Sequence, residues 1–403
     1  MKFHYKAKKS DGELIEGDRE ASDRFALART LRAEGEQLLL AKALTESGAK
    51  TRFSTTLFGR VKMRDKIIFA SSLGAMIGSG LSLARALHVI ERQTKHKRFQ
   101  FVIATVAGKI RNGESFSQSL EAFPDVFPPV FTAMVSAGEE SGNLTGALEI
   151  VSQQLSKSYD LRRKVKGAMI YPVIILCVII IIAIVMMIFL VPTITALFKE
   201  LNVELPFSTR VVIGTSDFIT GYPLLFFGGL IVIIGGLIGF GRSVVGHRTV
   251  NWLTLRLPAI KTITREMNSA IVMRTLSSLI SAGVSMVDSI IITKRVLQNY
   301  YFQETLALAA VEVPKGKPLS GIFKAREDIY PILVGEFTEV GEETGNLPGL
   351  LQKGAVFFEE EVNQATKNLT TIIEPALMVL IGLAVGFFAV SMIGPMYSLS
   401  NAF

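Results

Sequence analysis

The chain contains the same segment twice. Residues 125–148 read DVFPPVFTAMVSAGEESGNLTGAL and residues 328–351 read DIYPILVGEFTEVGEETGNLPGLL, with ten of 24 positions identical at an offset of 203 residues. Four further pairs share this offset without a gap: Gly80 and Gly283, Gly113 and Gly316, Pro172 and Pro375, and Pro192 and Pro395. A solenoid repeat is much shorter, roughly 20–50 residues. One whole module has therefore been duplicated, and the fold must accommodate both copies.

Three uncharged stretches, residues 167–198, 218–241 and 375–403, interrupt the chain. Each contains about 18 or more mostly apolar residues, enough for a helix to cross ~30 Å of hydrocarbon. We predict transmembrane helices at 170–192, 221–241 and 373–395. A buried core helix is the alternative interpretation of such runs, and it carries more weight for the second and third, which contain more glycine.

Lysine and arginine near the membrane ends predict the orientation. Five precede the first span and five follow the second: Lys157, Arg162, Arg163, Lys164 and Lys166, then Arg242, Arg248, Arg256, Lys261 and Arg265. We therefore predict that the N-terminus and both copies of the module face the cytosol. Residues 193–220 would form an external loop and residues 396–403 an external tail. The basic groups near the membrane would contact anionic lipid head groups.

Residues 1–45 are predicted to form a small cytosolic α/β unit. Phe3 and Tyr5 alternate with polar residues as on a half-buried strand, and Asp11-Gly12 is a hairpin signal. Residues 14–17 and 38–40 are candidates for the second and third strands. The candidate helix would have Ser22 as its N-cap, Phe25, Ala28 and Leu31 on its apolar face, and Gly35 at its end. Residues 46–62 are rich in Ser, Thr, Gly and basic residues and are predicted to be a linker.

Both copies of the module, residues 63–169 and 242–372, are predicted to be helical. Turn signals divide the first copy into about six helices. No helix breaker lies between Asn143 and Pro172, so the last helix can continue into the membrane. The fold class is thus mainly α. We expect a multi-pass membrane protein with two duplicated cytosolic helical bundles, three transmembrane helices and a small N-terminal α/β unit.

The motif G-E-E-[ST]-G-N-L occurs once in each copy, at 138–144 and 341–347. Gly142 and Gly345 can adopt the left-handed conformation that ends a helix. Asn143 and Asn346 can cap the helix that follows. The motif then joins two helices and leaves its acids around the turn, with Gly138, Glu139, Glu140, Gly341, Glu342 and Glu343 as its remaining candidate residues. There are three alternatives for these acids. They are solvated, they form a corner at which a partner docks, or they bind a divalent cation, for which the sequence specifies no third ligand.

Each of the two similar spans carries a proline near either end. Proline is tolerated in membrane helices when neighbouring groups satisfy the freed carbonyl, and it kinks them. The predicted kink positions are Pro172, Pro192, Pro375 and Pro395.

No catalytic constellation is recognisable. The sequence lacks a P-loop, G-x-S-x-G, H-E-x-x-H and C-x-x-C, and its four histidines are scattered. The single cysteine, Cys177, cannot form an intrachain disulfide. We therefore predict no enzymatic activity, no cofactor, and no catalytic or metal-binding residues. No aromatic-interleaved basic patch indicates nucleic-acid binding. The spans have no ionisable residue at mid-membrane, which argues against a transporter.

The sequence resembles the type II secretion F / type IV pilus PilC family of inner-membrane platform proteins. The resemblance lies in the paired motifs, each preceded ten residues earlier by Pro128 or Pro331, in the order of the three spans, and in the Tyr5…Gly12…Gly17 pattern. The resemblance covers essentially the whole chain. It implies six-helix cytosolic domains, homo-oligomers, other inner-membrane machine components, and a separate hexameric cytosolic ATPase that acts on those domains. Pilin or pseudopilin subunits would then be lifted from the bilayer into a fibre.

The resemblance leaves type IV pilus assembly, type II secretion and DNA-uptake pili as alternatives, and the C-terminal segment favours the pilus branch. A membrane adaptor scaffold unrelated to fibres is the alternative function. It predicts co-purification with signalling partners and normal pili in a deletion strain. A secretion-type ATPase and prepilins encoded nearby would instead favour the platform.

Overall fold

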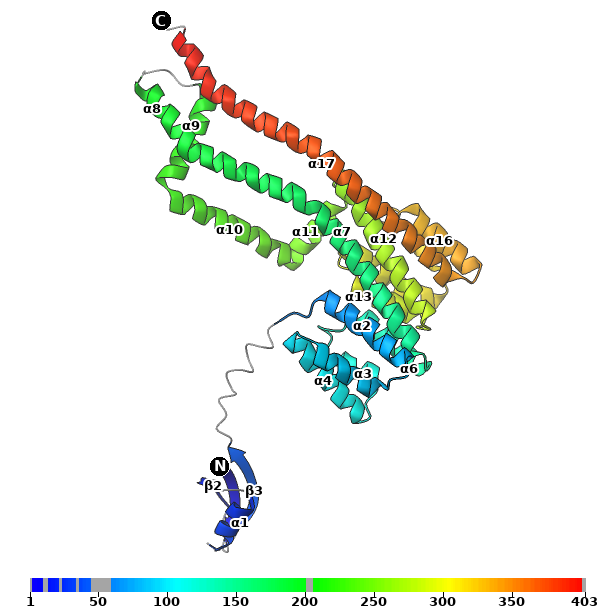
Figure 1. Cartoon of the computed structure of the whole chain (residues 1–403). Helices are drawn as coiled ribbons and strands as arrows, with labels where there is room; N and C mark the ends of the chain where they lie inside the picture. The colour runs from blue at the N-terminus through cyan, green and yellow to red at the C-terminus, as the bar shows by residue number, and fades with distance from the viewer. Residues whose placement is uncertain are drawn as a thin grey trace. The chain divides into compact units, whose positions relative to one another are not determined.

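The computed structural model describes residues 2–9, 14–21, 24–33, 36–44, 59–200 and 206–400 (Figure 1). Within these ranges the protein is mainly helical and divides into two compact units. One comprises residues 1–60 with 95–100, and the other residues 61–94 with 101–403.

The N-terminal unit has a three-stranded antiparallel sheet in the order β2-β1-β3. Its elements are β1 (Lys2–Lys9), β2 (Leu14–Glu20), α1 (Arg24–Ala33) and β3 (Glu36–Leu44). Ala7 of the central strand is buried with Leu27 and Leu31 of α1. The second and third strands are longer than the predicted segments 14–17 and 38–40. The predicted hairpin Asp11-Gly12, the helix cap Ser22 and the helix end Gly35 lie outside the described residues, as does most of the predicted linker.

The first copy of the module, hereafter the first repeat, runs from α2 to the first half of α7. Its helices are α2 (Met63–Gly78), α3 (Leu83–Gln93), α4 (Lys97–Arg111), α5 (Phe116–Glu121), α6 (Pro129–Glu140) and α7 (Leu144–Val185). Phe69, Phe127 and Phe131 form an aromatic cluster in its core, with ring centroids 5.0–6.2 Å apart. Such aromatic contacts add to the stabilisation from burial itself.

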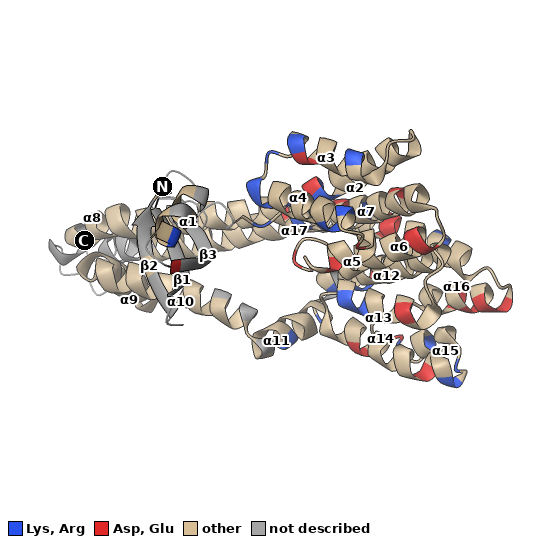
Figure 2. Cartoon of the chain, turned by 90° about the horizontal axis from the view of Figure 1, so that it is seen from below, with Lys and Arg blue, Asp and Glu red and all other residues tan. Residues whose placement is uncertain are grey.

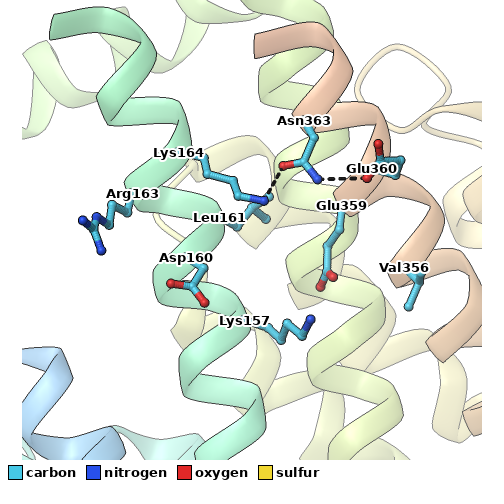
Figure 3. Close-up of a pocket in the computed structure, with 9 residues that line it drawn as sticks. All are labelled: Lys157, Asp160, Leu161, Arg163, Lys164, Val356, Glu359, Glu360 and Asn363. Carbon is cyan, nitrogen blue, oxygen red and sulfur yellow. Dashed lines mark hydrogen bonds between the residues drawn. The ribbon is translucent and has the colours of Figure 1, made fainter. Parts of the chain in front are cut away.

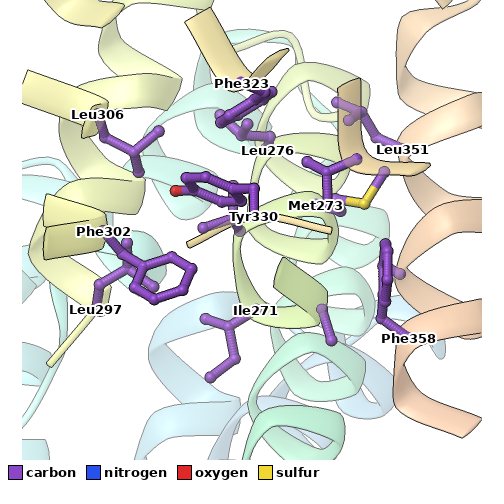
Figure 4. Packing of buried hydrophobic residues seen from close by; sticks show 14 of the residues in the cluster. Ile271, Met273, Leu276, Leu297, Phe302, Leu306, Phe323, Tyr330, Leu351 and Phe358 are labelled. Carbon is purple, nitrogen blue, oxygen red and sulfur yellow. The ribbon is translucent and has the colours of Figure 1, made fainter. Parts of the chain in front are cut away.

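The second repeat has the same order of helices. It comprises α12 (Pro258–Ser281), α13 (Met286–Val296), α14 (Tyr300–Glu312), the 3₁₀ turn η2 (Val313–Lys315), α15 (Leu319–Lys324), α16 (Ile332–Glu343) and α17 (Leu347–Ser400). Tyr330 occupies the position of Phe127 and packs on Phe302 and Phe323 at 4.8 and 4.9 Å between ring centroids (Figure 4). Met273, Leu351 and Phe358 complete this side of the core.

Three described helices are long and apolar enough to cross a membrane, within Leu144–Ala196, Pro223–Gly241 and Leu347–Ser391. Between the repeats lie the π-helical turn η1 (Met186–Leu190), α8 (Val191–Glu200), α9 (Phe207–Gly221), α10 (Pro223–Arg242) and α11 (Val244–Thr254). Figure 2 shows the charged residues gathered on the helical repeats, whereas the part of α10 that is not grey has none. This separation is expected of helices in hydrocarbon, where a charged side chain is costly.

Residues 193–220, expected to be a loop, instead contain α8 and α9. Val212 and Ile213 of α9 are buried against Val191, and Met187 and Phe388 pack on the same cluster. This apolar contact explains why the segment is helical rather than irregular, because the packing of an apolar face supplies most of a short helix's stability. The chain at 201–205 is not among the described residues.

Three of the four prolines predicted to kink the spans lie inside uninterrupted helices. Helix α7 continues through Pro172, and α17 continues through Pro375 and Pro395. The change of helix type occurs at η1, just before Pro192. Since Pro192 has no N–H, a carbonyl in the preceding turn needs another donor. Within η1, Met187 O accepts a 2.5 Å hydrogen bond from Ser216 Oγ.

Candidate functional site

The motif 138–144 forms the corner between α6 and α7. Gly142 has φ of +68°, the left-handed conformation predicted from the sequence, in which a side chain would be strained. Asn143 Oδ1 accepts a 3.1 Å hydrogen bond from Gly146 N and thereby caps α7. The corner therefore both ends one helix and starts the helix that enters the membrane.

The corner of the second repeat, residues 341–347, has the same geometry. Gly345 has φ of +67°, and Asn346 Oδ1 accepts a 3.3 Å hydrogen bond from Gly349 N. Helix α17 then begins at Leu347, just as α7 begins at Leu144. The duplication has thus preserved backbone geometry as well as sequence at both corners.

The first glutamate of the motif is held by the protein rather than left in solvent. Glu139 Oε1 accepts a 2.7 Å hydrogen bond from Phe116 N, and Oε2 accepts bonds from Ser117 N and Ser117 Oγ at 3.0 and 2.8 Å. Burial raises the pKa of Glu139, but these hydrogen bonds outweigh burial and lower the pKa overall. The carboxylate therefore satisfies backbone N–H groups at the start of the short helix α5.

Glu342 does the same in the second repeat. It accepts hydrogen bonds from Leu319 N, Ser320 N and Ser320 Oγ at 2.7, 3.2 and 2.5 Å, at the start of α15. Of the alternatives left open for the corner, solvation therefore does not describe Glu139 or Glu342. The sequence around the motif gave no signal for this contact, because the donors precede each glutamate by 22 and 23 residues.

The second glutamate of each motif remains at the surface. Glu140 and Glu343 are exposed, and Glu140 Oε1 accepts a 3.2 Å hydrogen bond from Ser136 Oγ. Among the described residues, no group of three or more His, Cys, Asp or Glu side chains could hold a metal ion. Because Glu139 is committed to α5, the pair Glu139–Glu140 does not present two free carboxylates to a cation.

The first glycine of the motif permits close approach of two helices. A Cβ placed on Gly138 would lie 2.2 Å from the Cβ of Ala147, and one on Gly341 would lie 2.9 Å from the Cα of Leu347. Both distances are far below van der Waals contact, so a side chain there would push α6 from α7, or α16 from α17. The glycines thus fix each corner through packing.

A juxtamembrane cleft of about 680 Å³ lies between α7 and α17 (Figure 3). Lys164 Nζ donates a 2.8 Å hydrogen bond to Asn363 Oδ1, and Asn363 Nδ2 donates one of 3.1 Å to Glu360. The cleft is lined by Lys157, Asp160, Leu161, Arg163, Lys164, Val356, Glu359, Glu360 and Asn363. Charged side chains of both signs line the cleft.

The cleft separates the two helices that join the repeats to the membrane. Helices α7 and α17 contact one another and run side by side from the repeats toward α8 and α9 (Figure 1). Beyond the cleft their exposed faces become apolar; Ile170 is 57% exposed and Ile372 63%. A helix needs no hinge to pass from one environment to the other, because its backbone groups are satisfied internally.

The chain matches the family described as "Type II secretion system (T2SS), protein F" twice, over residues 69–192 and 272–395. Both boundaries of the second match lie 203 residues after those of the first, which is the offset of the internal duplication.

Relatives similar over nearly their whole length carry two kinds of name. The "Type IV pilus assembly protein PilC" of Thermus thermophilus is 31% identical, with 98% of each chain covered. That of Myxococcus xanthus is 29% identical, covering 99% of this chain and 95% of the relative. The "Type II secretion system protein F" of Xanthomonas campestris pv. campestris is also 29% identical, with 99% of each chain covered.

Proposed function

Because this chain belongs to the type II secretion system protein F family, and is thus an inner-membrane component of a pilus or secretion machine, we propose that it is the non-enzymatic platform of that machine. In this role it couples a hexameric cytosolic assembly ATPase to the insertion of pilin or pseudopilin subunits into a fibre. The names of the relatives support both a type IV pilus and a type II secretion setting. The proposal covers either machine.

Helical continuity is the observation that carries the proposed coupling. Helix α7 begins at the corner of the first repeat and continues unbroken to Val185, and α17 runs from the second corner to Ser400. A helix resists sharp bending because its i→i−4 hydrogen bonds must lengthen or break. Pro172 removes one such bond in α7, and Pro375 and Pro395 each remove one in α17, but both helices continue through these residues, so a displacement of the repeat is passed along the helix axis. We infer that force applied to the repeats reaches the outer end of the spans, where η1 and α9 meet α17.

The proposed topology places the N-terminus and both repeats in the cytosol and the C-terminus outside. The bases that flank the first two spans support this orientation, including Arg163 and Lys164 at the cleft. In this orientation the cleft opens at the cytosolic surface of the bilayer, beside lipid head groups. The six-helix repeats and the N-terminal unit would then be accessible to the ATPase, and residues 193–220 to partners outside.

The platform is proposed to act as a homo-oligomer together with other inner-membrane components. At the corners, the exposed Glu140 and Glu343 are the acids available for partner docking, because Glu139 and Glu342 are occupied by α5 and α15. A docking test that reverses the charge of Glu139 would therefore confuse loss of contact with loss of fold.

The experiment is a pull-down of tagged full-length protein from detergent-solubilised membranes, followed by mass spectrometry. We expect recovery of a hexameric assembly ATPase and prepilins. A Glu140→Lys/Glu343→Lys variant should lose the ATPase if the corners dock it, and Glu149→Lys, on the surface of α7, is the matched control. Recovery of neither protein with a folded, oligomeric chain would contradict the platform role and favour the adaptor scaffold.

A further inference from the structure

The two repeats within one chain are packed head to tail. Helices α6 and α7 of the first repeat pack against α12 and α13 of the second, and α7 also packs along α17. Among the described helices, no comparable packing of α2 and α3 on α16 and α17 occurs in return. The interface is therefore heterologous: each repeat contributes a different surface, and one surface of each kind is left unused.

Polar contacts at this interface are specific and buried. Gln154 of α7 is only 3% exposed; its Nε2 donates a 2.8 Å hydrogen bond to Thr275 Oγ1, and its Oε1 accepts one of 3.3 Å from Ser278 Oγ. Farther along α7, the Arg162 guanidinium donates a 3.2 Å hydrogen bond to Val296 O at the end of α13. Leu161 belongs to the same buried cluster as Ile271 of α12.

The unused surfaces can be located with the 203-residue offset. We define the leading face as the surface of α16 and α17 that corresponds to α6 and α7. The trailing face is the surface of α2 and α3 that corresponds to α12 and α13. On the leading face, Phe357 stands where Gln154 does and is 39% exposed, against 3% for Gln154. On the trailing face, Ile68 stands where Ile271 does and is 52% exposed, against 4%.

Other side chains on these faces are complementary. The leading face also exposes Ile332 and Val340, at 60% and 43%. In place of Thr275 and Ser278 the trailing face has Ser72 and Ala75, small residues against which an aromatic ring can pack. Three of the four acids of α16 are already bound within the chain, Glu336 and Glu339 to Lys324 and Glu342 to the start of α15, so the complementarity of the faces is apolar rather than ionic (Figure 2).

The internal arrangement is also compatible with a common membrane. The operation that places the first repeat on the second brings α7 onto α17, and these helices leave the repeats in the same direction (Figure 1). Repeating that operation keeps the spans of the next chain in the same bilayer. An interface that inverted one chain would not do so.

We propose that copies of this chain associate head to tail, with the leading face of one chain packed on the trailing face of the next. This contact repeats between chains the packing that already exists within one chain. It deepens the homo-oligomer part of the proposed function and does not depend on ATPase coupling. Heterologous contacts of this kind close into a ring when successive rotations return to the starting chain.

The test uses two differently tagged full-length chains co-expressed in membranes, both with Cys177→Ser. One carries Ser72→Cys and the other Phe357→Cys, and a short bismaleimide is added. Because the corresponding positions Gln154 and Thr275 are in hydrogen-bond contact within the chain, we expect a covalent product that bears both tags. Leu308→Cys, at 51% exposure on α14, replaces Phe357→Cys as the matched control and should give no product.

The outcomes separate this inference from the broader proposal. Two chains that both carry only Phe357→Cys should not crosslink; if they do, the interface is isologous and the inference is wrong. An oligomer seen by native mass spectrometry without the 72–357 product would also overturn the inference while leaving the homo-oligomer intact. A monomeric chain would overturn both.

A disruptive variant provides an independent measurement. Ile68→Asp/Phe357→Asp places charges in both halves of the interface, so we expect the dissociation constant between chains to rise about tenfold or more. Ile68 is 52% exposed within one chain, so Ile68→Asp alone should change the thermal midpoint of the isolated protein little. Phe357 also contacts the rings of Phe337 and Phe358, at 6.5 and 5.2 Å between centroids, so Phe357→Asp should lower the midpoint as well. An unchanged dissociation constant would contradict the proposal.

Discussion

Glu139 Oε1 lies 2.7 Å from Phe116 N, so the acidic corner of the first repeat is tied to a helix that begins 23 residues earlier in the chain. The second repeat has the same relationship at an offset of 203 residues. In the G-E-E-[ST]-G-N-L motif, the first glutamate thus stabilises the fold, and the second glutamate is free to make other contacts.

Replacing Glu139 by Gln should destabilise the first repeat. The neutral amide keeps the shape but loses the charge-assisted hydrogen bonds from Phe116 and Ser117, worth about 1–3 kcal/mol together. Thermal unfolding of the purified protein in detergent measures the effect. Glu140→Gln is the control, because an exposed substitution should stay within about 0.5 kcal/mol. Equal midpoints for the two variants would show that the Glu139 contact contributes nothing.

Gly138→Ala should separate α6 from α7. The added Cβ would lie 2.2 Å from that of Ala147, an overlap that the backbone must relieve at a cost of about 1–3 kcal/mol. Gly108→Ala in α4 is the matched control, because no atom beyond the adjoining residues and the backbone of its own helix lies within 4 Å of the added Cβ. There the better helix propensity of alanine should stabilise the protein by about 0.5–1 kcal/mol. We expect the unfolding midpoint to fall for Gly138→Ala and to rise for Gly108→Ala, relative to the parent protein.

Glu266 should make the second repeat less stable as the pH rises. Burial, with a smaller effect from Glu361, raises the pKa of Glu266 from 4.5 to about 7, and its Oε2 is buried without a hydrogen-bond partner. A carboxyl whose pKa is higher in the folded state costs no stability below pH about 4.5. Its penalty grows as the pH rises towards 7 and is constant above that.

Glu266→Gln should therefore be more stable than the parent at pH 8 and equal to it at pH 4. Because the side chain is partly exposed, we expect a gain of about 1 kcal/mol rather than the full value of the pKa shift. Unfolding midpoints recorded between pH 4 and 8 provide the measurement. A constant difference across that range would show that Glu266 does not titrate with the fold.

The sequence predicted those parts of the fold that depend on local chemistry. The left-handed glycines Gly142 and Gly345, the caps Asn143 and Asn346, and the uninterrupted course of α7 from Asn143 past Pro172 all follow from neighbouring residues. The three candidate membrane helices follow from length and apolar composition.

The sequence alone could not predict contacts between residues that are far apart in the chain. The partner of Glu139 at Ser117 and the partner of Gln154 at Thr275 depend on how helices pack, which no local pattern specifies. The helicity of α9 was missed because its stabilising partners, Val191 and Phe388, lie elsewhere in the chain. The duplication was the one long-range signal available, and it related the two corners without indicating what the glutamates bind.

The measurement that tests the coupling account most directly compares two triple variants of α7. Lys157→Gly/Ser158→Gly/Asp160→Gly softens the helix between the corner and the membrane, and the corresponding alanine variant removes the same side chains but keeps the helix stiff. Each glycine disfavours helix by about 1 kcal/mol relative to alanine.

Both proteins should insert into the membrane at parental levels. Counting fibres on cells in which the variant replaces the parental protein, we expect assembly by the alanine variant and none by the glycine variant. Normal fibres from the glycine variant would contradict the claim that α7 transmits displacement from the first repeat into the membrane.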